Sequence, residues 1–192
     1  VTFPLGTKSF QRLIDGRTQG DINEFAKTAE SLWKDSIATR VDWELDNKPD
    51  FKSRDIMYLS GGIVWALASY LHPEEYDKNY IELSSSDISQ FRRMLISNYD
   101  ELINPPALKL ITDAGEVQAI KKNINRVMNT YDQRALTAGA TVLEGFMKLI
   151  NTVNPRKKFI YPKYAYVGWI SGYIIKKATT QYTGLVGQVA AR

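Results

Sequence analysis

Apolar side chains recur every three or four residues through most of this 192-residue chain, and no other feature restricts its fold as strongly. The pattern is clearest after Asp21, whose carboxyl group can cap a helix, with Glu24 placed to complete a capping box. The apolar positions that follow are Ile22, Phe25, Ala26, Ala29, Leu32, Trp33 and Ile37. We therefore expect an amphipathic helix from Asp21 to about Val41.

The same spacing predicts further helices along the chain. They are expected at Thr7–Asp15, Ser53–Leu71, Ser86–Asn104, Asp113–Asn154 and Lys163–Tyr182. The fourth either breaks or bends between Asn129 and Asp132. Strict alternation of apolar and polar residues is scarce, and Pro73–Ser85 is expected to be a loop in which Tyr80–Leu83 can be extended. The expected fold class is therefore all-α, a helical bundle of about six or seven helices.

The chain length suits one domain. Within it we expect an N-terminal helical arm at residues 1–50, a helical bundle core at 51–182 and a flexible tail at 183–192. The most apolar run, Ile56–Leu71, is shorter than the roughly 20 residues that span a bilayer, so it is expected to be a central helix. Gly61 and Gly62 inside that helix would each cost about 1 kcal/mol relative to Ala, so a neighbouring backbone is expected to approach there.

The chain has no cysteine and one histidine. These counts exclude disulfide bonds, thiolate metal sites, a cysteine nucleophile and zinc sites with several histidines. His72 precedes Pro73 at an expected helix end, where a capping or solvent-exposed role is favoured over catalysis. No P-loop surrounds Gly61-Gly62, and no Gly-x-Ser-x-Gly motif is present. We expect a protein that is not an enzyme and needs no metal or cofactor; a site assembled from dispersed residues remains an alternative.

Charge is distributed unevenly along the chain. Glu144 is the last acidic residue, and the eight Lys and Arg residues after it carry +8. Because the whole chain carries +4, residues 1–144 carry −4. Such asymmetry favours a polyanion, or an acidic partner surface, for the basic end. The alternative is a solvated basic end that the acidic part of the same chain balances.

The segment Asn154–Tyr164 concentrates this positive charge between two prolines and alternates it with aromatic residues. Cations can neutralise phosphates, and aromatic rings can stack on bases or sugars. The candidate nucleic-acid-binding residues here are Arg156, Lys157, Lys158 and Lys163. The alternative is a basic linker whose Phe159 and Tyr161 pack into the core.

A second basic region lies on the helix expected after Asp113. Lys122 and Arg126 share a side of that helix, Lys121 lies alongside, and Arg134 follows beyond the expected break. A helix can meet phosphates through such a stripe without reading bases. A solvated helix face is the alternative.

The last expected helix is apolar nearly all round, whereas a surface helix would have a polar face. It is therefore either core or half of a subunit contact, since small residues allow close approach and large aromatics anchor interfaces. The candidate subunit-interface residues are Tyr166, Gly168, Trp169, Gly172 and Tyr173.

Together these features resemble the major coat proteins of filamentous and rod-shaped viruses of hyperthermophilic archaea. The resemblance rests on the absence of cysteine, the abundance of Ile, Lys and Tyr, and the all-helical pattern. It also rests on the basic helix positions Lys121, Lys122 and Arg126, and on the small and aromatic residues from Tyr164 to Lys177.

The resemblance implies a structural protein of the virion, assembled in the host cytoplasm. Coat proteins of this family form helical bundles, often as pairs of related subunits, and wrap double-stranded DNA held in an A-like form. Their N-terminal helical arm commonly clamps the DNA. Here residues 1–50 carry seven cations and nine acids, which suits a clamp poorly. Either a preceding segment supplies the charge, or the stretch after Glu144 contacts the phosphates.

We therefore expect a major coat subunit that polymerises helically around nucleic acid, with double-stranded DNA favoured, through sequence-independent phosphate contacts. Its partners would be the nucleic acid, other copies of itself and a related second coat protein, with no transmembrane segment. The alternative is a non-enzymatic helical interaction or regulatory module whose basic C-terminal part docks an acidic protein.

Overall fold

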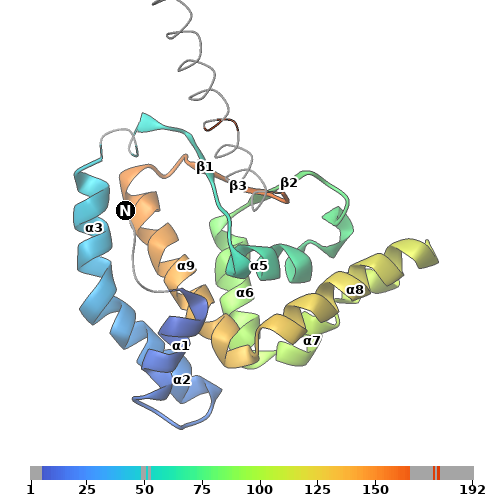
Figure 1. Ribbon diagram of the computed structural model, residues 1–192, viewed down its shortest axis with the longest axis horizontal. Helices are drawn as coiled ribbons and strands as arrows, with labels where there is room; N and C mark the ends of the chain where they lie inside the picture. Colours follow the sequence, from blue (N-terminus) through green and yellow to red (C-terminus); the bar gives the residue numbers. More distant parts are fainter. Residues whose placement is uncertain (1–5, 49–50, 52, 165–174, 176, 178–192) are drawn as a thin grey trace, which may run out of the picture.

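The computed structural model describes residues 6–48, 51, 53–164, 175 and 177. Most helices pack around one long central helix, α9, and a small sheet lies near its carboxyl end (Figure 1). The helices are α1 (Thr7–Asp15), α2 (Ile22–Leu32), η1 (Trp33–Ala38), α3 (Thr39–Asp46), α5 (Gly62–Leu71), η2 (Pro73–Glu75), α6 (Ser85–Ser97), α7 (Tyr99–Ile103), η3 (Pro106–Lys109), α8 (Ala114–Thr130) and α9 (Gln133–Val153). The strands are β1 (Ile56–Tyr58), β2 (Tyr80–Leu83) and β3 (Lys158–Pro162). The fold is mainly helical.

The three-stranded sheet corrects the expected all-α class. Its order is β1-β3-β2, with β1 parallel and β2 antiparallel to β3. In the antiparallel pair, Ile81 lies opposite Tyr161 and Leu83 opposite Phe159. Phe159 and Tyr161 are buried on one side of β3, while Lys158 points outward. The interpretation of this segment as a basic stretch whose two aromatics pack into the core is therefore confirmed, although it is a strand and not a linker.

The expected helix at Ser53–Leu71 is wrong in its first half, because Ile56–Tyr58 pairs with β3. Helix α5 begins only at Gly62. The preceding residue, Gly61, has a φ of 126°, which residues other than glycine rarely adopt. A Cβ atom on Gly62 would lie 1.8 Å from the Tyr131 hydroxyl oxygen. Gly61 thus makes the turn into the helix, and Gly62 leaves room for a side chain, not for a neighbouring backbone.

The N-terminal helices pack against the bundle and share its core. Phe10 and Ile14 of α1 and Phe25 of α2 are fully buried, and both helices contact α9. The helix after Asp21 continues through η1 and α3 to Asp46, beyond the expected end near Val41. Residues 6–48 of the segment expected as an arm thus pack into the body of the fold.

Several helix starts follow local capping chemistry. Asp21 accepts hydrogen bonds from the backbone N–H groups of Asn23 and Glu24, and the bond from Glu24 contributes most to lowering the pKa of the Asp21 carboxyl. Asp113 caps α8 in the same way. The chain breaks, and does not bend, between α8 and α9, because Asp132 caps α9 through the N–H of Ala135. Ser84, not Ser86, caps α6.

Candidate nucleic-acid interface

Helix α8 extends from the body of the fold toward one end of the molecule (Figure 1). Its buried residues, Ile120, Ile124 and Val127, lie on one side, none of them among its first six residues, and it packs mainly on α5. The helical period places the exposed polar residues on the opposite side. We call this surface the α8 cation face; its residues are Gln118, Lys121, Lys122, Asn125, Arg126 and Asn129.

The α8 cation face carries positive charge that no carboxylate neutralises within the described part of the chain. Lys121, Lys122 and Arg126 take part in no ion pair there. Glu116 is the one acid within α8, and the helical period turns it away from this face. Cations interleaved with amide side chains, which donate hydrogen bonds, suit the oxygens of a phosphate backbone.

A hollow of about 730 Å³ borders the α8 cation face. We call it the α5–α8 pocket; the residues of interest in its lining are Trp65, Ser69, Tyr76, Asn123, Arg126 and Lys163. Arg126 belongs to both surfaces, because its guanidinium carbon lies 5.6 Å from the centre of the Trp65 ring. One of the unpaired cations of the α8 cation face therefore also lines the pocket.

A closed set of hydrogen bonds holds the Trp65 side of this pocket. The indole N–H of Trp65 donates to Asn123 Oδ1 at 3.1 Å, and Asn123 Nδ2 donates to Ser69 Oγ at 2.7 Å. The Ser69 hydroxyl in turn donates to the backbone carbonyl of Trp65 at 2.8 Å. This network joins α5 to α8 and fixes the orientation of the indole ring.

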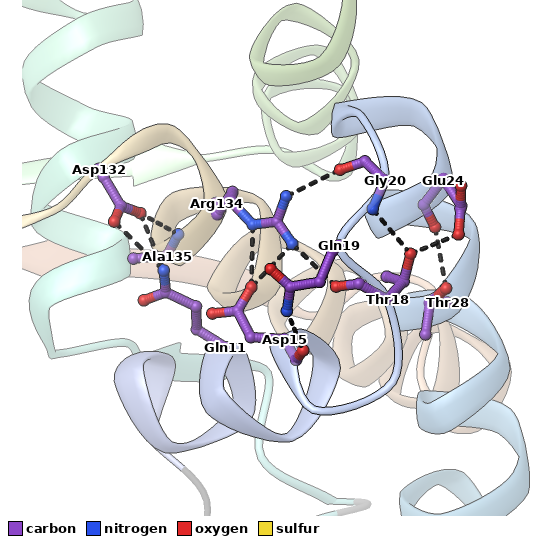
Figure 2. A network of polar contacts seen from close by, with 10 residues as sticks. All are labelled: Gln11, Asp15, Thr18, Gln19, Gly20, Glu24, Thr28, Asp132, Arg134 and Ala135. Carbon is purple, nitrogen blue, oxygen red and sulfur yellow. Dashed lines mark hydrogen bonds and ion pairs between the residues drawn. The ribbon is translucent and has the colours of Figure 1, made fainter.

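Arg134, which the sequence suggested as a nucleic-acid-binding residue, makes its hydrogen bonds within the protein (Figure 2). Its Nε donates to Asp15 Oδ1 at 2.9 Å, and its two terminal nitrogens donate to the backbone carbonyls of Gly20 and Thr18. Its guanidinium carbon also lies 4.3 Å from the Phe25 ring centre. Arg134 therefore clamps the start of α9 to the α1–α2 loop and has little capacity left for a phosphate.

Two candidates from the basic segment Asn154–Tyr164 are also held by backbone carbonyls. Lys157 is buried, and its Nζ donates to the carbonyls of Phe51 and Arg54. Lys163 Nζ donates to the carbonyl of Tyr76.

The other two candidates of this segment are exposed. Lys158 lies 3.7 Å from Glu82 Oε1 on the neighbouring strand. The Arg156 guanidinium has no partner among the described residues. Tertiary structure thus brings Lys163 and Arg126 to one pocket and keeps Arg134 and Lys157 away from it.

The candidate subunit-interface residues Tyr166, Gly168, Trp169, Gly172 and Tyr173 lie outside the described residues, as does the expected tail at 183–192.

The sequence did not single out Trp65, Ser69 and Asn123 as site residues. Trp65 lies in the apolar run Ile56–Leu71, which predicts a central helix, and the two polar residues follow no motif. The interleaving of amides with cations along α8 was the available signal for Gln118, Asn125 and Asn129.

Comparison with protein-family models, with curated proteins and with solved structures found no match to this chain. The described helices are each too short or too polar to cross a membrane. Among those residues, no three His, Asp or Glu side chains gather as a metal ion would require.

Proposed function

We propose that this protein is a structural subunit that coats nucleic acid, holding the phosphate chain through the α8 cation face and polymerising along it. The observation that carries the proposal is the set of exposed cations Lys121, Lys122 and Arg126 on one helix face, unpaired within the described residues. Phosphate contacts of this kind are independent of sequence and supply most non-specific affinity.

Assembly along the polymer has separate support from the sheet. Among the described residues, strands β1 and β2 are the edges of this sheet, and an edge strand presents backbone groups that can pair with another chain. Ile56 and Tyr58 on β1 are 46% and 67% exposed. Head-to-tail contacts that do not close into a ring produce a helical filament. Double-stranded DNA, a second related subunit and a place in a virion follow from the family resemblance and stay predictions.

The alternative, a module that docks an acidic protein through its basic C-terminal part, has less support. Lys157 and Lys163 already donate to backbone carbonyls, and Lys158 faces Glu82. In that part of the chain, the Arg156 guanidinium remains exposed and without a partner among the described residues.

The proposal is tested by measuring the affinity of the purified protein for DNA and RNA oligomers at several salt concentrations. The variant Lys121→Ala/Lys122→Ala/Arg126→Ala is compared with Arg17→Ala/Lys27→Ala/Lys34→Ala, which removes the same charge from exposed positions on the loop after α1, on α2 and on η1. Each lost phosphate contact should reduce the slope of log affinity against log salt by about 0.7–0.9. We expect the α8 variant to lose roughly two to three contacts and the control almost none.

Equal losses in both variants would mean that net charge alone drives binding and would contradict the proposal. Electron microscopy with and without nucleic acid tests polymerisation. Discrete small particles under all conditions at low salt would remove the coat function, and binding only to acidic proteins would favour the docking module.

A further inference from the structure

The α5–α8 pocket combines an aromatic wall with cations at its mouth. Trp65, Tyr76 and Tyr164 all line it, and Tyr164 is exposed. Arg126 lies over the Trp65 ring, and Lys163 Nζ lies 5.7 Å from the Tyr76 ring centre and 5.8 Å from that of Tyr164. Rings beside cations suit an occupant that has a flat aromatic group and a negative charge close to each other.

The hydrogen-bonding groups on the Trp65 side of the pocket are already engaged within the protein, so an occupant would contact this wall mainly through the aromatic rings. The single donor of Trp65 is already used by Asn123, and the network through Ser69 closes on the Trp65 backbone. Asn123 and Ser69 keep additional acceptor capacity, because amide and hydroxyl oxygens each have two lone pairs. The pocket therefore offers stacking first and a few hydrogen bonds second.

The charge of the lining favours an anion at the mouth. Glu75 is an acid in the lining, and its carboxylate is 2.9 Å from Lys78 Nζ, an ion pair that raises the pKa of that lysine. His72 also lines the pocket, and its two ring nitrogens lie 3.8 Å from a carboxylate oxygen of Glu74 and 3.6 Å from one of Asp87. Arg126 has no carboxylate partner in the described part of the chain.

The pocket also has the volume for such a group. Ligand pockets commonly enclose about 300–1,000 Å³, and this one encloses about 730 Å³. Because Arg126 belongs to both the pocket and the α8 cation face, a polymer lying along α8 passes the mouth of the pocket.

We propose that the α5–α8 pocket receives an unstacked base of a single-stranded nucleic acid whose phosphates lie along the α8 cation face. This inference rests on the proposed function and names its substrate class as single-stranded nucleic acid, in place of the double-stranded DNA that the family resemblance implies. A base in a duplex is paired and stacked, so it can enter a pocket only after it is flipped out, at a cost in free energy. A single strand has no such cost, and its bases stack readily on aromatic side chains.

The test compares three probes with the full chain by fluorescence anisotropy. They are a single-stranded oligomer of about 12 nucleotides, an abasic strand with the same number of phosphates, and a duplex of that length. We expect the base-bearing strand to bind about five- to a hundredfold more tightly than the abasic strand, which corresponds to stacking of one base.

A tryptophan pair provides the matched variants. Trp65→Leu should remove most of the preference for the base-bearing strand, measured as the ratio of its affinity to that of the abasic strand. Trp43→Leu is the control, because Trp43 is 61% exposed on α3 and does not line the pocket. Should Trp65→Leu fail to fold, equal affinity of the unchanged protein for the base-bearing and abasic strands would still overturn the inference.

The outcomes separate the two proposals. Equal affinity for base-bearing and abasic strands, or tighter binding of the duplex, would overturn the pocket inference and leave phosphate coating intact. Binding of none of the probes at low salt would overturn both.

Discussion

Arg126 and Arg134 have the same side chain and opposite environments. Arg126 is exposed beside Trp65 and has no carboxylate partner among the described residues. Arg134 makes charge-assisted hydrogen bonds to Asp15 and to two carbonyls. A guanidinium group presents its donors in a rigid fork, so a fork that is filled inside the protein cannot also grip a phosphate.

Arg134→Ala is expected to lower the free energy of unfolding by about 1–3 kcal/mol, because the carbonyls of Thr18 and Gly20 lose their donor. The free energy of unfolding of Arg134→Lys should lie between those of Arg134→Ala and the parent protein, because lysine keeps the charge but lacks the forked donors of a guanidinium group. Urea unfolding measures both. The affinity of folded Arg134→Ala for nucleic acid should equal that of the parent; a large loss with unchanged stability would mean that Arg134 contacts the polymer.

Tyr70 provides a second prediction at the level of a single side chain. It is 1% exposed, and its hydroxyl has no hydrogen-bond partner among the described residues. Burial, with a smaller contribution from Tyr99, raises the pKa of this phenol. Tyr70→Phe removes the unpaired hydroxyl, so we expect the free energy of unfolding to stay the same or to rise by up to about 1 kcal/mol. A loss of stability in thermal or urea unfolding would mean that the hydroxyl has a partner.

The contact between α9 and η1 depends on the absence of a side chain at one position. A Cβ atom on Gly145 would lie 2.2 Å from Trp33 Cε2, and Trp33 is buried. An indole ring in a packed core cannot move aside without displacing its neighbours. The pairing of Trp33 with Gly145 therefore determines how closely α9 and η1 approach.

Gly145→Ala is expected to destabilise the protein by about 1–3 kcal/mol through overpacking, although alanine favours a helix by about 1 kcal/mol. Gly16→Ala is the control, because its Cβ would have ordinary contacts of 3.5 Å and 3.6 Å and the backbone there is already helical. Urea unfolding should separate the two variants. Equal stabilities would mean that Trp33 repacks without cost.

Packing is uneven across the whole molecule. Helix α9 contacts α1, α2, η1, α3, α5 and α6, and its residues from Ala135 to Ile150 supply much of the core. Helix α8 packs mainly on α5, and its first turns contribute no buried residue. Local opening costs least where few apolar contacts must break.

Amide hydrogen exchange should therefore be slowest in the middle of α9 and much faster in the first turns of α8. Binding of nucleic acid should slow exchange in α8 more than in α9, because the proposed contacts lie on α8. Mass spectrometry of peptides from the two helices measures this. Equal protection in the free protein would contradict the uneven packing.

Local sequence determined the helices whose starts and faces depend on neighbouring residues. The helix Thr7–Asp15, the caps at Asp21 and Asp113, and the separation of buried from exposed positions on α8 all followed from spacing and capping. The cation face on α8 was predictable for the same reason, since residues three and four apart share one side of a helix.

Tertiary structure alone decided how the strands of the sheet pair and which of the candidate cations are held inside the fold. Ile56–Tyr58 forms a strand because β3, about a hundred residues later, supplies its hydrogen bonds, and the apolar pattern of such a short run fits a helix equally well. Lys157, Lys163 and Arg134 are held by carbonyls from distant segments, and the α5–α8 pocket needs α5, α8 and the end of β3 together. Spacing along a chain encodes which residues share a face, but the partners across that face come from elsewhere in the sequence.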